Sequence, residues 1–293
     1  MNEDGKILNL DFLLRPFFTY TKSLFLFFFI ILCFSTYLSF QLTEIYKSES
    51  SIVIKDKYKV LNSSESNMLS GLSALTGSGS SASTDLKIIE IAKSRDFFEE
   101  LYNNKDFMLH SFAIKEYDKN EKVTIFLPEF YDKSDEYNLL KSPPFMEAYN
   151  QFIQSRIEIT KDRSSGIIKI SMNSKSPSSA KYLLEIVIEN FVSYLTERER
   201  KNAESSYNYL LKMSIQNNPK TVDKVLAKLM EADIQITILS NSKNGLLEII
   251  DSPYEPSRKS APSKLTFILS LTLISFIFFY VVLIFILSAK NTK

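Results

Sequence analysis

Histidine and cysteine, two residue types often used in catalysis and in metal binding, are nearly absent from this chain. His110 is its only histidine and Cys33 its only cysteine, and Cys33 lies inside a long apolar stretch. A metal or general-base site needs several such groups converging on one point, and a thiolate nucleophile needs a base beside it. We therefore interpret His110 as a partly buried loop residue and Cys33 as a lipid-facing or packing residue. We expect no catalytic, metal or cofactor site, and no enzymatic activity.

Charged residues are concentrated in the segment TERERKN, residues 196–202. The spacing allows helical i,i+4 ion pairs such as Glu197–Lys201, which is typical of an exposed helix face. A second hypothesis places Glu197, Arg198 and Arg200 at an interface between copies of the chain. The sequence leaves both hypotheses open.

A proline-rich segment, DSPYEPSRKSAPSK, occupies residues 251–264. Proline fixes its own φ angle and lacks a backbone N–H, so such a segment is stiff and does not continue a helix or a central strand. It directly precedes a long apolar block. We expect it to couple the domain before it to the membrane after it.

Two blocks without any charged residue lie near the ends of the chain, at 24–42 and 265–289. A helix needs about 20 apolar residues to cross a bilayer, so both blocks are predicted to be transmembrane helices. The first block could instead be a cleaved signal peptide, but no small-x-small cleavage site follows it.

The flanking cations predict the orientation of the two spans. Lys6, Arg15 and Lys22 precede the first span, and Lys290 and Lys293 follow the second. Short basic tails favour the cytoplasmic side, whereas a long loop is translocated largely regardless of its charge. The chain as a whole is balanced, with 35 Lys and Arg against 34 Asp and Glu, so a nucleic-acid partner is not indicated. The expected segments are a cytoplasmic tail at 1–23, spans at 24–42 and 265–289, an external domain at 43–264 and a cytoplasmic tail at 290–293.

The first part of the external domain gives mixed signals. Residues 51–60 are rich in β-branched residues and are predicted to form a strand, and the Ser/Gly-rich stretch 62–84 is predicted to be a loop. A short helix is expected over 85–101, with Ser83 or Thr84 as its N-cap. Between 103 and 149 only a strand at 122–127 is indicated.

The second part of the domain is clearer. Residues 157–161 and 166–172 alternate with a period of two and predict a β-hairpin. Ser176-Pro177 then begins an apolar stripe at helical spacing, which predicts one long helix over 177–213. The sequence Asn217-Asn218-Pro219 ends it. A second helix is expected to return, although residues 234–238 alternate and could form a strand, and a last strand is expected at 246–250.

Both ends of the domain are thus strands that adjoin membrane spans. The expected fold is α+β, with a small mixed sheet at the base and a long protruding helical hairpin, placed between two transmembrane helices.

This order of elements resembles the Wzz-type chain length determinants, or polysaccharide co-polymerases. The stretch IKISMNSKSPSSAKYLLEIVIENFVSYLTERERKNAESS is similar to the family's passage from strand to long helix, and NLDFLLRPFFTYTKSLFLF to its lead into the first span. The family's proline motif is matched by Pro253, Pro256, Pro262 and Ser263, with Ala261 in place of a serine. Where the family has two glycines four apart in the second span, this chain has Ser275 and Phe279.

The resemblance implies a function without catalysis. Members of the family form homo-oligomers in the bacterial inner membrane, with the main domain in the periplasm, and set the chain length of O-antigen or related surface polysaccharides. The implied partners are further copies of the chain, a membrane polysaccharide polymerase and the growing polysaccharide.

Two alternatives are compatible with the same sequence. One is an inner-membrane component of capsule or exopolysaccharide export, which would act on transport and not on length. The other is a periplasmic sensor, which would need a separate signalling partner because the expected cytoplasmic tails are short.

Overall fold

The computed structural model of the chain describes residues 20–55, 80–128, 130, 142–162, 164–216, 226, 227, 230, 233, 234, 237 and 246–291. The chain divides into two compact units. The first consists of Met1–Glu44 with Ser260–Lys293, and the second of Ile45–Lys259.

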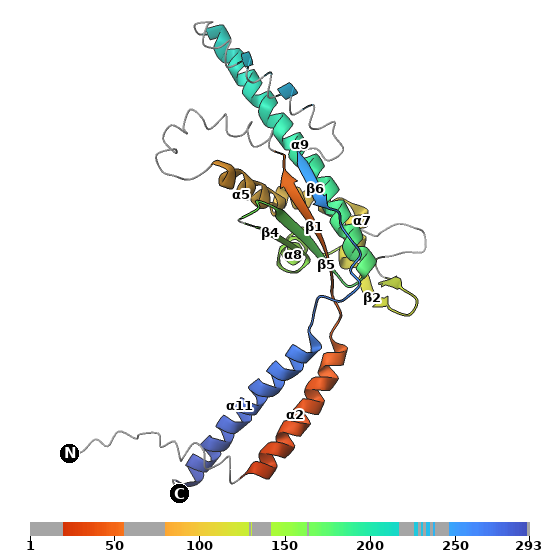
Figure 1. Cartoon of the computed structure of the whole chain (residues 1–293), viewed down its shortest axis with the longest axis vertical. Coiled ribbons are helices and arrows are strands. Elements are labelled where there is room, and N and C mark those ends of the chain that lie inside the picture. The colour runs from red at the N-terminus through yellow and green to blue at the C-terminus, as the bar shows by residue number, and fades with distance from the viewer. Residues whose placement is uncertain are drawn as a thin grey trace, which may run out of the picture. The chain divides into compact units, whose positions relative to one another are not determined.

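Two long apolar helices make up the described part of the first unit (Figure 1). Helix α2 spans Thr21–Gln41 and helix α11 spans Lys264–Asn291, and both are long and apolar enough to cross a membrane by length and composition. Most of their large apolar side chains are exposed, as expected for helices that face lipid. The prediction of two long apolar helices near the two ends of the chain is confirmed.

Small hydroxyl residues lie where α2 and α11 pack together. Ser35, Ser39 and Thr272 are buried, and the Thr272 hydroxyl donates to Ser35 Oγ over 3.4 Å. Small side chains let two helix backbones approach closely in a membrane. Phe279, at a position where the resembled family has a glycine, stacks on Phe27 with 3.7 Å between the ring centroids.

The second unit is built around a four-stranded sheet in the order β4-β5-β1-β6. Its strands are β4 (Ile157–Lys161), β5 (Ile168–Ser174), β1 (Tyr46–Ile54) and β6 (Leu247–Asp251). Every pairing in this sheet is antiparallel. The expected α+β class is confirmed, but the sheet is antiparallel throughout and not mixed, because β1 runs opposite to both of its neighbours, β5 and β6. The predicted hairpin and the last strand are confirmed, whereas β1 begins earlier than expected and residues 56–60 lie outside the described residues.

A tight turn joins β4 to β5. Gly166 takes a φ of +70°, which a residue without Cβ adopts readily. Asp162 Oδ1 accepts hydrogen bonds from the hydroxyl and the backbone N–H of Ser164, over 2.7 and 2.9 Å. These hydrogen bonds favour the carboxylate and lower the pKa of Asp162 to about 2.

Helices cover one face of the sheet and enclose the core. Along β1 the even-numbered side chains from Tyr46 to Ile54 are all buried, whereas most of the odd-numbered ones are partly exposed, as expected for a sheet with one open face. The core contains five fully buried phenylalanines, which are Phe97, Phe98, Phe107, Phe152 and Phe191.

The helices before β4 are shorter and more numerous than predicted. They are α5 (Ser80–Ala92), α6 (Arg95–Tyr102), α7 (Lys105–Phe112) and α8 (Phe145–Gln151), which continues as a π-helical turn η2 (Phe152–Arg156). The loop expected over 62–84 is wrong at 80–84, and its remainder up to 79 lies outside the described residues. The single helix expected over 85–101 is two helices, because Ser94 caps α6 by accepting from Phe97 N over 3.2 Å.

A separate two-stranded sheet joins β2 (Ile114–Asp118) to β3 (Val123–Phe126). It contains the strand predicted at 122–127. Its partner β2 was not predicted.

Helix α9 spans Pro177–Gln216 and confirms the predicted long helix. At 1.5 Å per residue it is about 60 Å long, and it extends beyond the end of the four-stranded sheet (Figure 1). Leu226, Ala227, Met230, Asp233, Ile234 and Thr237 are the described residues of the returning segment, and all are helical. The alternative of a strand at 234–238 is therefore wrong at Ile234 and Thr237.

Candidate functional site

The proline-rich segment leaves the sheet at the end of β6 and is held by two buried serines of β1. Ser50 Oγ donates to the carbonyl of Asp251 over 2.6 Å, and Ser48 Oγ donates to the carbonyl of Tyr254 over 2.7 Å. Both serines are nearly inaccessible to solvent. Proline has no backbone N–H and cannot complete a strand ladder. The serine hydroxyls hold this segment to β1 instead, by donating to its first carbonyls.

The four residues of the proline motif fall in different surroundings. Pro256 is buried, Pro253 and Pro262 are half-buried, and Ser263 is exposed. Pro253 and Pro256 belong to the second unit, whereas Pro262 and Ser263 belong to the first. The motif therefore spans the boundary between the units.

A charged group lies at the start of α11, within the first unit. Lys264 Nζ is 3.8 Å from a carboxylate oxygen of Glu44 and 4.7 Å from the ring centroid of Phe40. A lysine that contacts both an acid and an aromatic ring is typical of the boundary between hydrocarbon and water. Helix α11 thus begins at a charged residue, one position before the predicted start of the second span at 265, which stays a prediction.

In the charged belt of α9, residues 197–201, three side chains are paired within the helix itself, which are Glu197, Arg200 and Lys201, whereas Glu199 is buried with one carboxylate oxygen unbonded. Arg200 Nε and Nη2 bind the two carboxylate oxygens of Glu197 over 2.9 and 2.7 Å, and Arg200 Nη1 binds Glu204. Lys201 Nζ lies 3.6 Å from Glu197. The hydrogen bond from Arg200 lowers the pKa of Glu197, and the same bond raises the pKa of Arg200.

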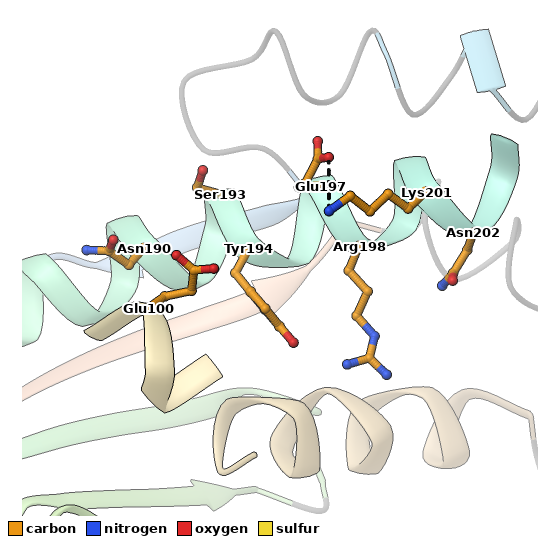
Figure 2. Close-up of a pocket in the computed structure, with 8 residues that line it drawn as sticks. All are labelled: Glu100, Asn190, Ser193, Tyr194, Glu197, Arg198, Lys201 and Asn202. Carbon is orange, nitrogen blue, oxygen red and sulfur yellow. Dashed lines mark ion pairs between the residues drawn. The ribbon is translucent and has the colours of Figure 1, made fainter. Parts of the chain in front are cut away.

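A groove of about 380 Å³ lies beside this belt (Figure 2). Its volume is at the small end of the range for ligand sites, about 300–1,000 Å³. It is lined by one residue of α6 and seven residues of α9, which are Glu100, Asn190, Ser193, Tyr194, Glu197, Arg198, Lys201 and Asn202.

The lining residues of α9 form two adjacent rows with i,i+4 spacing. One row is Asn190, Tyr194, Arg198 and Asn202, and the other is Ser193, Glu197 and Lys201. Residues four apart share one face of a helix. Figure 2 shows Tyr194, Arg198 and Asn202 leaving α9 on the same side, with Glu100 reaching toward them from α6.

Of the residues predicted for an interface between copies, the groove contains Glu197 and Arg198. Arg200 does not line it. The sequence reasoning missed Tyr194, Asn190 and Asn202. Their regular spacing was a usable signal, but Glu100 is brought to them only by tertiary packing.

His110 lies on α7 and joins it to α9. Its Nδ1 is 2.9 Å from Ser179 Oγ, and its ring packs edge-on against Tyr182 with 4.8 Å between centroids. Burial lowers the pKa of His110, although the nearby Asp106 carboxylate acts in the opposite direction. His110 is thus half-buried, as expected, but on a helix and not in a loop. Over the described ranges of the chain, no three His, Cys, Asp or Glu side chains are grouped so as to hold a metal ion.

The chain was compared with protein-family models, with curated proteins and with solved structures, and only solved structures match. No protein-family model matches the chain, and no curated protein does. A full-length bacterial polysaccharide co-polymerase is similar over 98% of this chain and 99% of its own, with a TM-score of 0.39 and 9% identity. A fragment of WzzB, a polysaccharide co-polymerase from Salmonella Typhimurium, is similar over 75% of this chain and 100% of its own, with a TM-score of 0.26 and 12% identity. Likenesses of this degree do not by themselves assign a function.

Proposed function

We propose that this chain regulates the length of a surface polysaccharide of the O-antigen type, as a non-catalytic oligomer beside a membrane polymerase. In this proposal it crosses the bacterial inner membrane twice, and the unit Ile45–Lys259 lies in the periplasm. The growing polysaccharide and the polymerase are its partners.

One observation carries the proposal. The first and last strands of the domain, β1 and β6, pair with each other. An apolar helix of membrane-spanning length precedes β1, and another follows β6. On the β6 side the connection is the proline-rich segment, whose first carbonyls are bound by Ser48 and Ser50. A stiff connection of this kind is suited to transmitting a rearrangement of the domain to the span.

Assembly into a homo-oligomer is part of the proposal. We place Arg200 of α9, which does not line the groove, at the contact between copies, with Glu197 and Arg198 at its edge where the groove stays open, because arginine and paired charges can fix the register of an interface. Light scattering of the full-length chain in detergent tests this part, and a monodisperse monomer would contradict it.

Deletion of the gene tests the proposal directly. We expect the modal size of the surface polysaccharide, resolved on a gel, to collapse into a random ladder in the deletion strain and to return on complementation. An unchanged ladder in a deletion strain that still makes polymer would overturn the proposal. If polymer instead disappears from the surface and accumulates inside at unchanged length, the chain acts in export.

Replacing the prolines tests the role of the segment. We expect complementation with Pro256→Ala/Pro262→Ala to give normal membrane levels of the chain but a shifted or broadened size distribution, because the connection is less stiff. The matched control is Pro144→Ala, outside the segment and exposed. Equal effects of the two variants, or no effect of either, would contradict a specific role for the segment.

A further inference from the structure

The groove beside α9 has the side chains of a site for an uncharged polyhydroxyl chain. It presents two amides, a hydroxyl, a tyrosine ring, two carboxylates and two cationic groups. Amide, carboxylate and guanidinium groups are planar and can pair with two neighbouring hydroxyls at once, as donors, acceptors or both. The apolar C–H face of a sugar ring can lie against an aromatic ring.

Charge in the groove is balanced. Glu100 and Glu197 oppose Arg198 and Lys201, and Lys201 is already paired with Glu197. Within the part of the chain that the structure describes, neither Glu100 nor Arg198 has an ion-pair partner, so both remain available to a ligand. A balanced groove gives no long-range attraction to a polyanion.

The tyrosine of the groove is held in position from behind. The Tyr194 ring packs against the fully buried Phe97, with 5.6 Å between centroids, and is itself half-buried. A ring fixed by the core loses little freedom when a ligand packs on it, which favours binding.

The groove also runs along the helix. From Asn190 to Asn202 the row of lining residues covers twelve steps of α9, or about 18 Å. A site of this length suits a segment of a polymer better than a single small molecule.

We infer that this groove binds a segment of an uncharged polysaccharide chain. The ring of Tyr194 packs on a sugar, and Arg198 and Glu100 bind its hydroxyls. Asn190, whose Nδ2 donates to the Ile186 carbonyl over 2.8 Å, accepts from a further hydroxyl through Oδ1. The inference rests on the proposed function, in which the growing polysaccharide is a partner, and it adds the place and the chemistry of the contact.

The absence of tryptophan from the chain permits a clean binding test. Tyr194→Trp places the only tryptophan of the chain in the groove, and its emission is followed in the full-length protein in detergent. The probe is delipidated surface polysaccharide from the source strain, with a heparin-derived oligosaccharide as the polyanionic comparison. Tyr254→Trp, at an exposed tyrosine outside the groove, is the control reporter.

We expect a saturable change in emission with the delipidated polysaccharide for Tyr194→Trp and none for Tyr254→Trp. Adding Arg198→Ala should weaken binding about tenfold or more, since it removes a charged hydrogen-bonding group. Arg258→Ala, at an exposed arginine outside the groove, should leave binding unchanged. No response to the polysaccharide, or an equal response to heparin, would overturn the inference. If Tyr194→Trp lowers the unfolding temperature, saturation-transfer NMR on the polysaccharide with the unaltered chain replaces the tryptophan reporter. No transfer to the polysaccharide, or equal transfer to heparin, would then overturn the inference.

A test in cells separates this inference from the proposed function. We expect Asn190→Ala/Arg198→Ala to shift the modal length of the polysaccharide at normal membrane levels of the chain. If deletion abolishes the modal length but the double variant keeps it, the groove inference fails and the proposed function stands. If deletion leaves the ladder unchanged while the reporter responds, the proposed function fails and the groove remains a binding site.

Discussion

His110 is held in surroundings that favour its neutral form. It is half-buried between α7 and α9, with Ser179 as its hydrogen-bond partner and the rings of Tyr182 and Phe126 against its edges. Burial penalises the imidazolium more than Asp106 stabilises it, so the pKa is lowered. In the unfolded chain the same side chain has a pKa of about 6.5.

Stability should therefore depend on pH through this residue. As the pH falls below about 6.5, the unfolded chain takes up a proton that the folded chain does not yet bind, so stability decreases until the folded pKa is passed. We expect the thermal unfolding temperature in detergent to fall between pH 7.5 and pH 5.5. His110→Gln should reduce this dependence, because no other histidine is present. An identical pH profile for the variant would show that other groups are responsible.

Two capping residues show which local features can be predicted from the sequence. Ser94 caps α6 and Asn104 caps α7, each by accepting from a backbone N–H three residues later. Both are ordinary capping signals, and they could have predicted two separate helices. By contrast, nothing near Glu100 in the sequence indicates that its side chain meets α9 in a groove.

Elements with strong periodicity were predictable, and those with weak periodicity were not. The hairpin of β4 and β5 and the long helix α9 follow from alternation and from a helical apolar stripe. Helix α8 is short and continues as a π-helical turn, and β2 has a single buried residue, so neither carries a clear pattern. The strand directions in the sheet could not be predicted from the sequence, because the position of β1 between β5 and β6 depends on pairing between segments far apart in the chain.

The packing of α6 on α9 is the contact on which the groove depends. Phe97 of α6 is fully buried and packs edge-on against Phe191 of α9, with 5.1 Å between centroids. We expect Phe97→Ala to destabilise the domain by about 3–5 kcal/mol, from lost burial and the cavity left behind. Leu86→Ala, at an exposed leucine of α5, is the control and should change stability by less than about 0.5 kcal/mol. Thermal unfolding in detergent compares the two, and equal values would contradict this account of the core.

At the scale of the whole molecule, the distribution of charge and apolar length predicts which side of the membrane each part occupies. The two helices of the first unit carry the apolar surface, and the unit Ile45–Lys259 carries most of the charged residues. The short terminal segments hold the flanking lysines and arginine. Together these features are the basis of our proposal that the domain lies outside the cytoplasm.

The single cysteine makes this orientation testable. In a Cys33→Ser background, Ser165→Cys puts a lone thiol in the exposed turn between β4 and β5. We expect a membrane-impermeant maleimide to label it in cells with a permeabilised outer membrane. A lone cysteine at Asn2 in the same background should be labelled only after lysis. The reverse pattern would show that the domain is cytoplasmic.

The pairing of β1 with β6 has a mechanical consequence. The start of β1 and the end of β6 lie at the same end of the ladder, since Ser51 is opposite Asp251 and Ile54 is opposite Leu247. A force that pulls the start of β1 away from the end of β6 would therefore break the pairs of this ladder one at a time, beginning at Ser51 and Asp251, and would not load them all in shear. The hydrogen bonds from Ser48 and Ser50 lie at this end of the ladder and would be loaded first. Such a force would thus strain the attachment of the proline-rich segment before it strains the pairs of the sheet.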